Sequence, residues 1–226
     1  NLGDIIITPS EYSKKLLASY NINKEIQVIS NGIDLNEYRK NELAGKTFRY
    51  HYGYSDTDKI IMSAGLIIKR KGILDFIELA KRMPEYQLWF GTADLRFAGK
   101  EIRKAVSEKI PNLTFAGYVN SKQLQAAYSG SDLFLFPSYE ETEGIVVLEA
   151  LAMKIPLLLR DIPVYNGWLE KGRDVYQAKK LDDFEKIARN ILEHKLPDLT
   201  EQGYQIIQKK NIHYIGNILF NVYNKV

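Results

Sequence analysis

The sequence contains no cysteine, which excludes a disulfide scaffold and any zinc site built on thiolates. It has only three histidines, which are scattered along the chain, and we predict no metal site. No apolar run approaches the roughly 18 residues that a membrane-spanning helix needs, so we expect no such helix. Neither sign of charge dominates: 31 basic and 28 acidic side chains leave a formal net charge of +3, which does not indicate a nucleic-acid partner.

The composition is that of an ordinary globular protein. The 226 residues, 45% of them hydrophobic and 26% charged, suffice for one large domain or two small ones with a buried core. These values exclude collagen-like, coiled-coil and disordered chains. The first residue is Asn1 rather than Met, and we therefore expect a processed chain or a piece of a longer protein.

Short apolar runs alternate with longer amphipathic segments, an order typical of an α/β domain with a parallel sheet. Strands are expected at residues 4–8, 26–30, 60–64, 87–90, 113–116, 132–136, 156–159 and 175–177. Helices are expected at residues 10–19, 72–82, 100–109, 121–128, 144–153, 182–194, 200–209 and 212–223, with Ser10 and Ser121 as N-caps. Residues 34–54 read as a polar connector with a short tyrosine-rich helix.

This pattern predicts a doubly wound, Rossmann-like parallel sheet of about six strands, with helices on both faces and a helical C-terminal tail. Ligands of such sheets bind beyond the carboxyl ends of the strands. We therefore expect the functional residues in the loops that follow Ala64, Phe90, Ala116 and Phe136.

The loop after Ala64 carries three cations beside a glycine that opens a helix, in the sequence Gly65-Leu-Ile-Ile-Lys-Arg-Lys-Gly72. Backbone amides, the helix dipole and side-chain charges can converge there on an anion. The alternative is a solvated basic loop. The spacing is not that of a Walker loop.

Carboxylates crowd the loop after Phe136, and one more lies inside the apolar helix that follows. Helix-dipole interactions explain Glu141 and Glu143 near the start of that helix. They do not explain Glu149, which has apolar neighbours and needs a partner such as ribose hydroxyls. Eight residues of helix rise ~12 Å, about the distance from ribose to hexose in an extended sugar nucleotide.

Together these segments resemble a known family. Glu141-x7-Glu149, embedded in Pro-Ser-x-x-Glu…Gly-Ile-Val-Val-Leu-Glu-Ala-Leu-Ala, is similar to the signature of retaining glycosyltransferases of family four, which have the two-domain GT-B fold. This sequence also resembles further motifs of that family, in the same order, at residues 4–14, 28–34, 65–72 and 115–119. More narrowly, the stretches at 69–78, 89–91, 140–144 and 160–165 resemble bacterial glucosyltransferases that build diacylglycerol and monoglucosyldiacylglycerol glycolipids.

The resemblance implies a role for each matched residue. Glu149 would hold the ribose hydroxyls, Glu141 would contact the donor sugar beside its anomeric carbon, and Lys71 would neutralise the diphosphate of the leaving nucleotide. Glu141 and Lys71 are thus the implied catalytic residues. Besides Glu149, the implied donor-binding residues are Gly65, Leu66, Lys69, Arg70, Gly91, Tyr118, Val119, Thr142, Glu143, Gly144 and Ile145. The family usually needs no divalent metal, so no cofactor is expected.

Two positions depart from the family pattern. Leu66 stands where the family usually has arginine, and we expect Lys69 or Arg70 to supply the missing cation. Glu143 stands where the family often has an aromatic residue, which should change the contacts to sugar or acceptor.

The resemblance also implies the domain organisation. Residues 1–36 would be a remnant of an N-terminal acceptor domain, 37–58 a connector, and 59–210 a Rossmann-like nucleotide-sugar-binding domain. Residues 211–226 would form a helix that packs toward the missing N-terminal domain. The chain is then a truncated enzyme, and we expect it to bind nucleotide without turnover.

The implied function is donor binding by a retaining glucosyltransferase that transfers a hexose, glucose from UDP-glucose, to diacylglycerol or monoglucosyldiacylglycerol. Two alternatives are a non-catalytic nucleotide-sugar-binding module and a GT-B-fold epimerase or phosphorylase. The expected partners are a UDP-sugar, a lipid acceptor held by the missing domain and an anionic membrane surface. We expect a cytoplasmic protein, peripheral at the inner face of the membrane.

Overall fold

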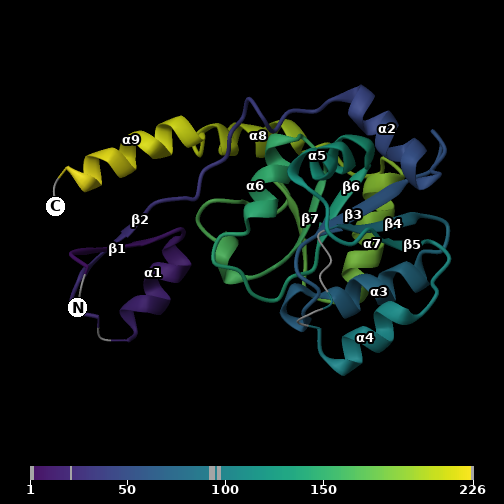
Figure 1. The fold of residues 1–226 in the computed structure, drawn as a ribbon, viewed down its shortest axis with the longest axis horizontal. Helices are drawn as coiled ribbons and strands as arrows, with labels where there is room; N and C mark the ends of the chain where they lie inside the picture. Colours follow the sequence, from purple (N-terminus) through teal and green to yellow (C-terminus); the bar gives the residue numbers. More distant parts are fainter. Residues whose placement is uncertain (1–2, 21, 92–94, 96–97, 225–226) are drawn as a thin grey trace.

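The computed structural model describes residues 3–20, 22–91, 95 and 98–224. Its centre is a parallel six-stranded sheet in the order β5-β4-β3-β6-β7-β8 (Figure 1). The strands are β3 (Ile60–Ala64), β4 (Gln87–Gly91), β5 (Leu113–Phe115), β6 (Leu133–Phe136), β7 (Leu157–Arg160) and β8 (Tyr176–Ala178). The predicted doubly wound sheet of about six strands is confirmed.

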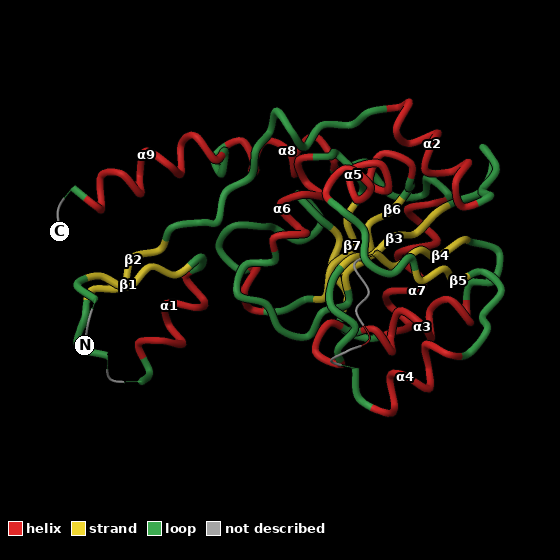
Figure 2. Tube along the Cα trace, in the orientation of Figure 1, coloured by secondary structure: helices red, strands yellow, loops and turns green. Residues whose placement is uncertain are grey.

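Helices cover both faces of this sheet (Figures 1 and 2). One face carries α2 (Glu42–Tyr52), α5 (Ser121–Gly130), α6 (Ile145–Ala152) and α8 (Thr200–Gln208). The other carries α3 (Ile73–Arg82), α4 (Lys100–Ser107) and α7 (Leu181–Leu192). Short 3-10 helices, η1 (Lys69–Lys71) and η3 (Pro163–Tyr165), lie in the loops after β3 and β7.

Alternation along the strands separates two hydrophobic cores. Ile60 and Met62 of β3 face the first core, whereas Ile61 faces the second. Because successive side chains of a strand point to opposite faces, a strand covered on both sides must be apolar throughout. All five residues of β3 are accordingly buried.

The N-cap of α5 differs from its prediction. The cap is Asn120 rather than Ser121: the Asn120 side chain accepts from the Gln123 amide, and the Gln123 side chain accepts from the Asn120 amide. This reciprocal capping box satisfies two helix-end donors at once, and a cap at Ser121 would not. The predicted cap of α1 (Glu11–Ala18), Ser10, is confirmed.

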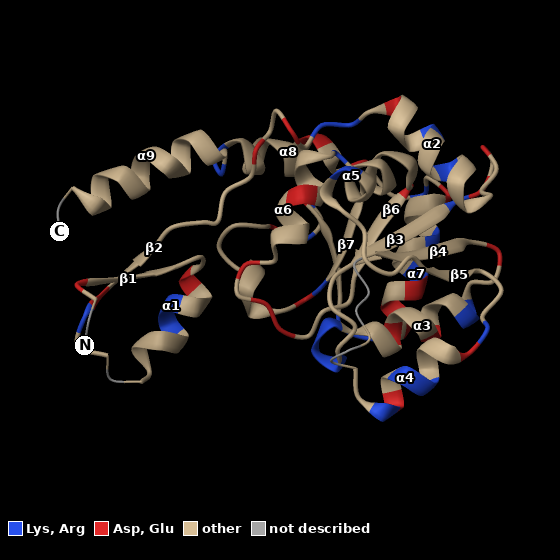
Figure 3. Ribbon diagram, viewed as in Figure 1, with Lys and Arg blue, Asp and Glu red and all other residues tan. Residues whose placement is uncertain are grey.

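A smaller unit lies beside the main sheet. It comprises the parallel pair β1 (Ile5–Thr8) and β2 (Glu25–Val28), with α1 and the C-terminal helix α9 (Ile212–Tyr223). Ile29, Ile215 and Val222 form its small buried core. In Figure 3, α9 carries no charged residue. The helix thus packs on the segment that the sequence assigned to the N-terminal domain; the domain boundaries themselves stay predictions.

None of the helices in the described part of the chain combines the length and the apolar character that crossing a bilayer requires.

Candidate functional site

The strand order reverses direction between β3 and β6, which are hydrogen-bonded neighbours. From β3 the chain builds β4 and β5 on one side and then returns to start β6 on the other. Such a switch point leaves a crevice at the carboxyl ends of the two strands. Of the four loops predicted to carry function, those after Ala64 and Phe136 meet here.

A cavity of about 360 Å³ opens at this point, and we term it the switch-point cavity. It is lined by Pro9, Asn31, Ala64, Gly65, Arg70, Lys71, Phe136, Glu141, Thr142, Gly144, Ile145 and Val146. Its volume lies in the range of small-molecule sites in proteins.

Hydrogen bonds hold the loop after β3 against the loop after β6. The Tyr139 amide donates to the Arg70 carbonyl at 2.8 Å, and Arg70 Nη1 donates to the Glu140 carbonyl at 2.7 Å. Gly72 adopts φ +72°, and a Cβ at this position would lie 2.2 Å from the Pro137 carbonyl oxygen. Only glycine therefore permits this approach, which brings the basic loop against the acidic one.

The predicted catalytic pair meets inside the cavity. Lys71 Nζ lies 2.5 Å from Glu141 Oε1, and the two side chains are 15% and 6% exposed. The ammonium also lies 5.6 Å from the centre of the Phe136 ring. This largely buried ion pair places one cation and one hydroxyl acceptor within reach of the same ligand in the cavity.

The N-terminus of α6 faces the same cavity. Its N-cap, Gly144, has φ +85° and offers no side-chain cap, while Ile145 and Val146 line the cavity. The first amides of a helix have no partner within the helix, and the dipole there favours negative charge. Together with Lys71, this end of α6 is suited to bind a phosphate group.

Glu149 lies one turn further along α6 and is 8% exposed. Its carboxylate accepts hydrogen bonds from the hydroxyls of Tyr38, at 3.0 Å, and Tyr128, at 3.1 Å. Burial raises the pKa of Glu149, and the two hydroxyls act against that rise. The sequence indicated that buried Glu149 needs a hydrogen-bonding partner. The structure shows that Tyr38 and Tyr128 supply it, and the sequence analysis did not identify either of them. Each carboxylate oxygen retains a second lone pair for a ligand hydroxyl.

Glu143 does not line the cavity. Its carboxylate, 1% exposed, accepts from Ser30 Oγ at 2.5 Å, the Asn31 amide at 2.9 Å, Asn31 Nδ2 at 2.8 Å and Lys210 Nζ at 2.7 Å. We call these four residues the Glu143 clasp. It joins the smaller unit and the turn between α8 and α9 to the loop after β6, and a role of Glu143 in donor binding stays a prediction.

Some of the remaining predicted donor-binding residues line the switch-point cavity, and others lie outside it. Gly65 and Arg70 line the cavity, whereas Leu66 is 46% exposed and lies outside it. Lys69 also lies outside and pairs with Glu101 at 3.7 Å, so Arg70 is the better placed substitute for the family arginine. Gly91 accepts from the Gly65 amide at 3.2 Å. Beside this edge of the sheet, Tyr118 is exposed and Val119 is buried.

The smaller unit also contributes to the cavity, which the sequence did not indicate. Pro9 and Asn31 line it. The hydroxyls of Ser10 and Ser13 donate to the Thr142 carbonyl at 2.5 and 3.1 Å, so Ser10 serves both as a helix cap and as a tie to the acidic loop.

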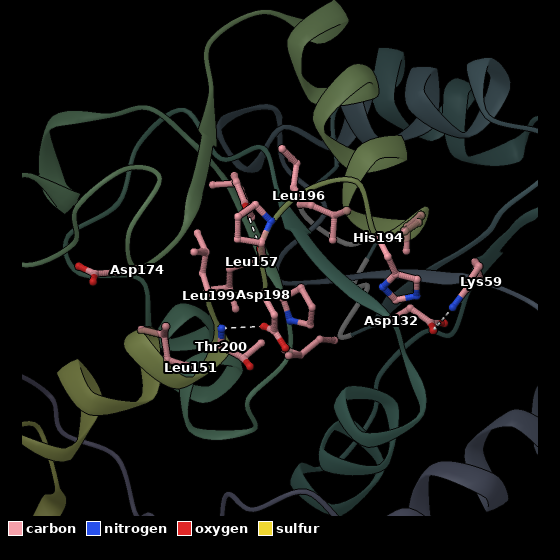
Figure 4. A pocket seen from close by; sticks show the side chains of 16 residues that line it. Lys59, Asp132, Leu151, Leu157, Asp174, His194, Leu196, Asp198, Leu199 and Thr200 are labelled. Carbon is pink, nitrogen blue, oxygen red and sulfur yellow. Dashed lines mark hydrogen bonds and ion pairs between the residues drawn. The ribbon is translucent and has the colours of Figure 1, made fainter.

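A second cavity, of about 120 Å³, lies at the opposite, amino ends of the strands. Figure 4 shows the side chains that line it. There His194 lies near the ion pair of Lys59 and Asp132, whose charged atoms are 3.3 Å apart. Within the described residues, no group of three or more His, Cys, Asp or Glu could hold a metal ion. The candidate site is the switch-point cavity, where Lys71, Glu141 and the start of α6 come together.

Two relatives are similar along most of the chain. It is 40% identical over 227 residues to the processive diacylglycerol alpha-glucosyltransferase of Acholeplasma laidlawii, covering 100% of this chain and 68% of that protein. It is 33% identical over 186 residues to the alpha-galactosylglucosyldiacylglycerol synthase of Streptococcus pneumoniae, covering 78% of this chain but only 48% of that protein.

Solved structures share the fold. Anabaena Alr3699/HepE, solved in complex with UDP-glucose, matches with a TM-score of 0.86 at 16% identity, over 99% of this chain and 64% of that one. Sucrose-phosphate synthase from Thermosynechococcus elongatus matches with a TM-score of 0.85 at 19% identity, over 99% and 58%. The family model described as glycosyl transferases group 1 matches residues 46–207. This chain therefore belongs to the glycosyl transferases group 1 family, as its motifs predicted.

Proposed function

We propose that the switch-point cavity binds UDP-glucose, or a close relative of it, as the donor of a retaining glucosyltransferase that makes diacylglycerol glycolipids. The observation that carries this proposal is the placement of Lys71, Glu141 and the free start of α6 around one cavity. The names of the Acholeplasma and Streptococcus relatives support a glycolipid product. The neighbour solved with UDP-glucose supports the donor.

In this proposal the diphosphate lies at the start of α6, between the two carboxylates of that helix and its loop. Lys71 leaves Glu141 to neutralise the diphosphate, and its charge counts most as the leaving nucleotide forms. Glu141, released from Lys71, accepts hydroxyls of the donor sugar beside the anomeric carbon. Glu149, held by Tyr38 and Tyr128, accepts the ribose hydroxyls.

The cation at the diphosphate comes from the chain itself, with Lys71 and Arg70 lining the cavity. The proposal accordingly requires no divalent metal. The lipid acceptor and a peripheral site at the inner membrane face belong to the same proposal. Co-sedimentation of the chain with anionic vesicles at low salt tests the membrane site, and absence of binding would remove it.

The donor is tested by calorimetric titration with UDP, UDP-glucose, ADP-glucose and GDP-mannose, each with and without EDTA. We expect the uridine nucleotides to bind best and EDTA to change nothing. Lys71→Met should lower the affinity for UDP by about 10- to 100-fold, because a hydrogen bond to a charged group contributes about 1.5–3 kcal/mol.

The matched control is Lys154→Met, which makes the same chemical change at an exposed ion pair with Glu201. It should leave the affinity for UDP unchanged. Equal affinity for UDP in wild type and Lys71→Met would overturn the assignment of the diphosphate site.

A further inference from the structure

A second depression lies directly beside the switch-point cavity and shares Arg70 with it. It measures about 570 Å³ and runs between α1 and the loops after β3 and β6. We call it the Tyr139 groove, and its walls include Tyr12, Lys69, Arg70, Asp75, Tyr139 and Glu140. Since Glu141 follows Tyr139 by only two residues, a ligand in this groove would lie next to the donor sugar.

The charges of the groove cancel. Two cations, Lys69 and Arg70, and two carboxylates, Asp75 and Glu140, stand on its walls. Carboxylates repel a phosphate, and the four charged groups among the eight lining residues disfavour a purely hydrocarbon ligand such as an acyl chain, because charges lose their hydration against a hydrocarbon. A neutral ligand that bears hydroxyl groups suits both signs, since it can donate to the carboxylates and accept from the cations.

Tyr139 is held as a rigid platform. Its hydroxyl donates to Asp75 Oδ2 at 2.7 Å, and the Arg160 guanidinium lies 3.8 Å from the ring centre. Arg160 is itself fixed by the carbonyls of Pro137, at 2.9 Å, and Lys179, at 2.8 Å, and by Asp75. Arg160 is buried, whereas Tyr139 remains 52% exposed. One face of the ring is thus covered and the rest is open to the groove.

An open aromatic face held in place is suited to a sugar ring. Its electron-rich surface attracts the weakly positive C–H groups on one side of a pyranose, while the sugar hydroxyls reach polar groups at the ring edge. Preorganisation lowers the entropy cost of binding, because Tyr139 and Arg160 need not be ordered by the ligand.

We propose that the Tyr139 groove is an acceptor subsite that binds a neutral hexosyl headgroup, stacked on Tyr139 and hydrogen-bonded to Asp75 and Glu140. This inference rests on the proposed function, which places the donor sugar in the adjoining cavity. It adds a sugar-recognising residue, Tyr139, beside the proposed donor cavity.

The test is saturation-transfer NMR on the 226-residue chain with methyl α-glucoside, glycerol or inorganic phosphate as the probe, in the presence of UDP. We expect transfer to the ring C–H protons of methyl α-glucoside, weaker transfer to glycerol, and no displacement of the glucoside by phosphate. Tyr139→Ala should lower the glucoside affinity by about tenfold and Tyr139→Phe by less than about threefold, since phenylalanine keeps the stacked ring.

The matched control is Tyr50→Ala, because Tyr50 is 88% exposed and lies on α2, outside both cavities. It should leave the glucoside affinity unchanged. UDP affinity, measured in parallel, should agree between wild type and all three variants, which also verifies folding.

Three results would overturn the inference: no saturation transfer to the glucoside, an equal affinity in Tyr139→Ala, or displacement of the glucoside by UDP-glucose, which would place it in the donor-sugar position. Retained UDP binding in any of these cases would leave the proposed function intact. Loss of UDP binding in the wild-type chain would instead contradict the proposed function itself.

Discussion

Replacing Glu143 with glutamine removes the negative charge from the centre of the Glu143 clasp without changing the shape of the side chain. The carboxylate accepts from Ser30, twice from Asn31, and from Lys210. A glutamine has a single acceptor oxygen, and its amide group would face donors instead of accepting from them. The substitution therefore leaves some of these donors without an acceptor.

The burial of Glu143 and Lys210 determines how much stability the substitution should remove. Glu143 is 1% exposed and the Lys210 side chain is 17% exposed. Removing one partner of a buried ion pair costs about 3–5 kcal/mol, and we expect about 3 because water reaches Lys210. For a chain of this size, 3 kcal/mol lowers the unfolding temperature by about 6–12 °C.

Amide hydrogen exchange shows which part of the fold loses stability in Glu143→Gln. The Ile33 amide donates to the Lys210 carbonyl at 3.0 Å, next to the clasp, whereas the Leu88 amide donates to Asn112 in the main sheet at 2.7 Å. If the clasp holds the smaller unit, protection of the Ile33 amide should fall by about a hundredfold in Glu143→Gln. Protection of the Leu88 amide should fall no further than that of Ile33.

Glu201→Gln is the matched control, because Glu201 pairs with Lys154 at the same 2.7 Å distance but on the surface. Exposed pairs contribute at most about 1 kcal/mol, so this variant should unfold almost like the wild type. An unchanged unfolding temperature and unchanged Ile33 protection in Glu143→Gln would refute the reasoning.

Three further outcomes are expected. Burial raises the pKa of Glu149, so the affinity for UDP, measured by calorimetry, should fall as the pH falls through that raised pKa. Tyr128→Phe removes a hydrogen bond that lowers this pKa, so in that variant the affinity should begin to fall at a higher pH. In urea titrations Gly72→Ala should lower the free energy of unfolding by about 2–4 kcal/mol, because the new Cβ clashes with Pro137 and the backbone is left-handed. Gly53→Ala, where the backbone is also left-handed but the space is open, should lower it by about 1 kcal/mol. The Tyr165 hydroxyl is buried without a hydrogen-bond partner among the described residues, so Tyr165→Phe should keep or raise the unfolding temperature, and a marked fall would reveal a bond to that hydroxyl.

Local patterns in the sequence predicted most of the fold. The bounds of α9 agree with the prediction, and α3, α6 and α8 agree within two residues at each end. The misplaced cap of α5 had a usable signal: Gln123 lies three residues after Asn120, which is the capping-box spacing.

The part of the site that could be predicted is the part that follows from the parallel order of the strands. Carboxyl ends of parallel strands share one edge, so Lys71 and Glu141 could be expected to lie close together. The partners of Glu149 and Glu143 could not. Tyr38 precedes Glu149 by 111 residues, and Asn31 precedes Glu143 by 112. Single polar contacts over such separations leave no periodicity in the sequence, and they depend on how the smaller unit packs against the main sheet.

The most direct test of the donor assignment compares UDP with UDP-glucose by calorimetry in Glu141→Ala and Glu149→Ala. If Glu149 holds the ribose, Glu149→Ala should weaken both ligands equally, by about tenfold for the lost hydroxyl bonds. If Glu141 holds the sugar, Glu141→Ala should weaken UDP-glucose but not UDP. Unchanged affinity for both ligands in both variants would contradict the account.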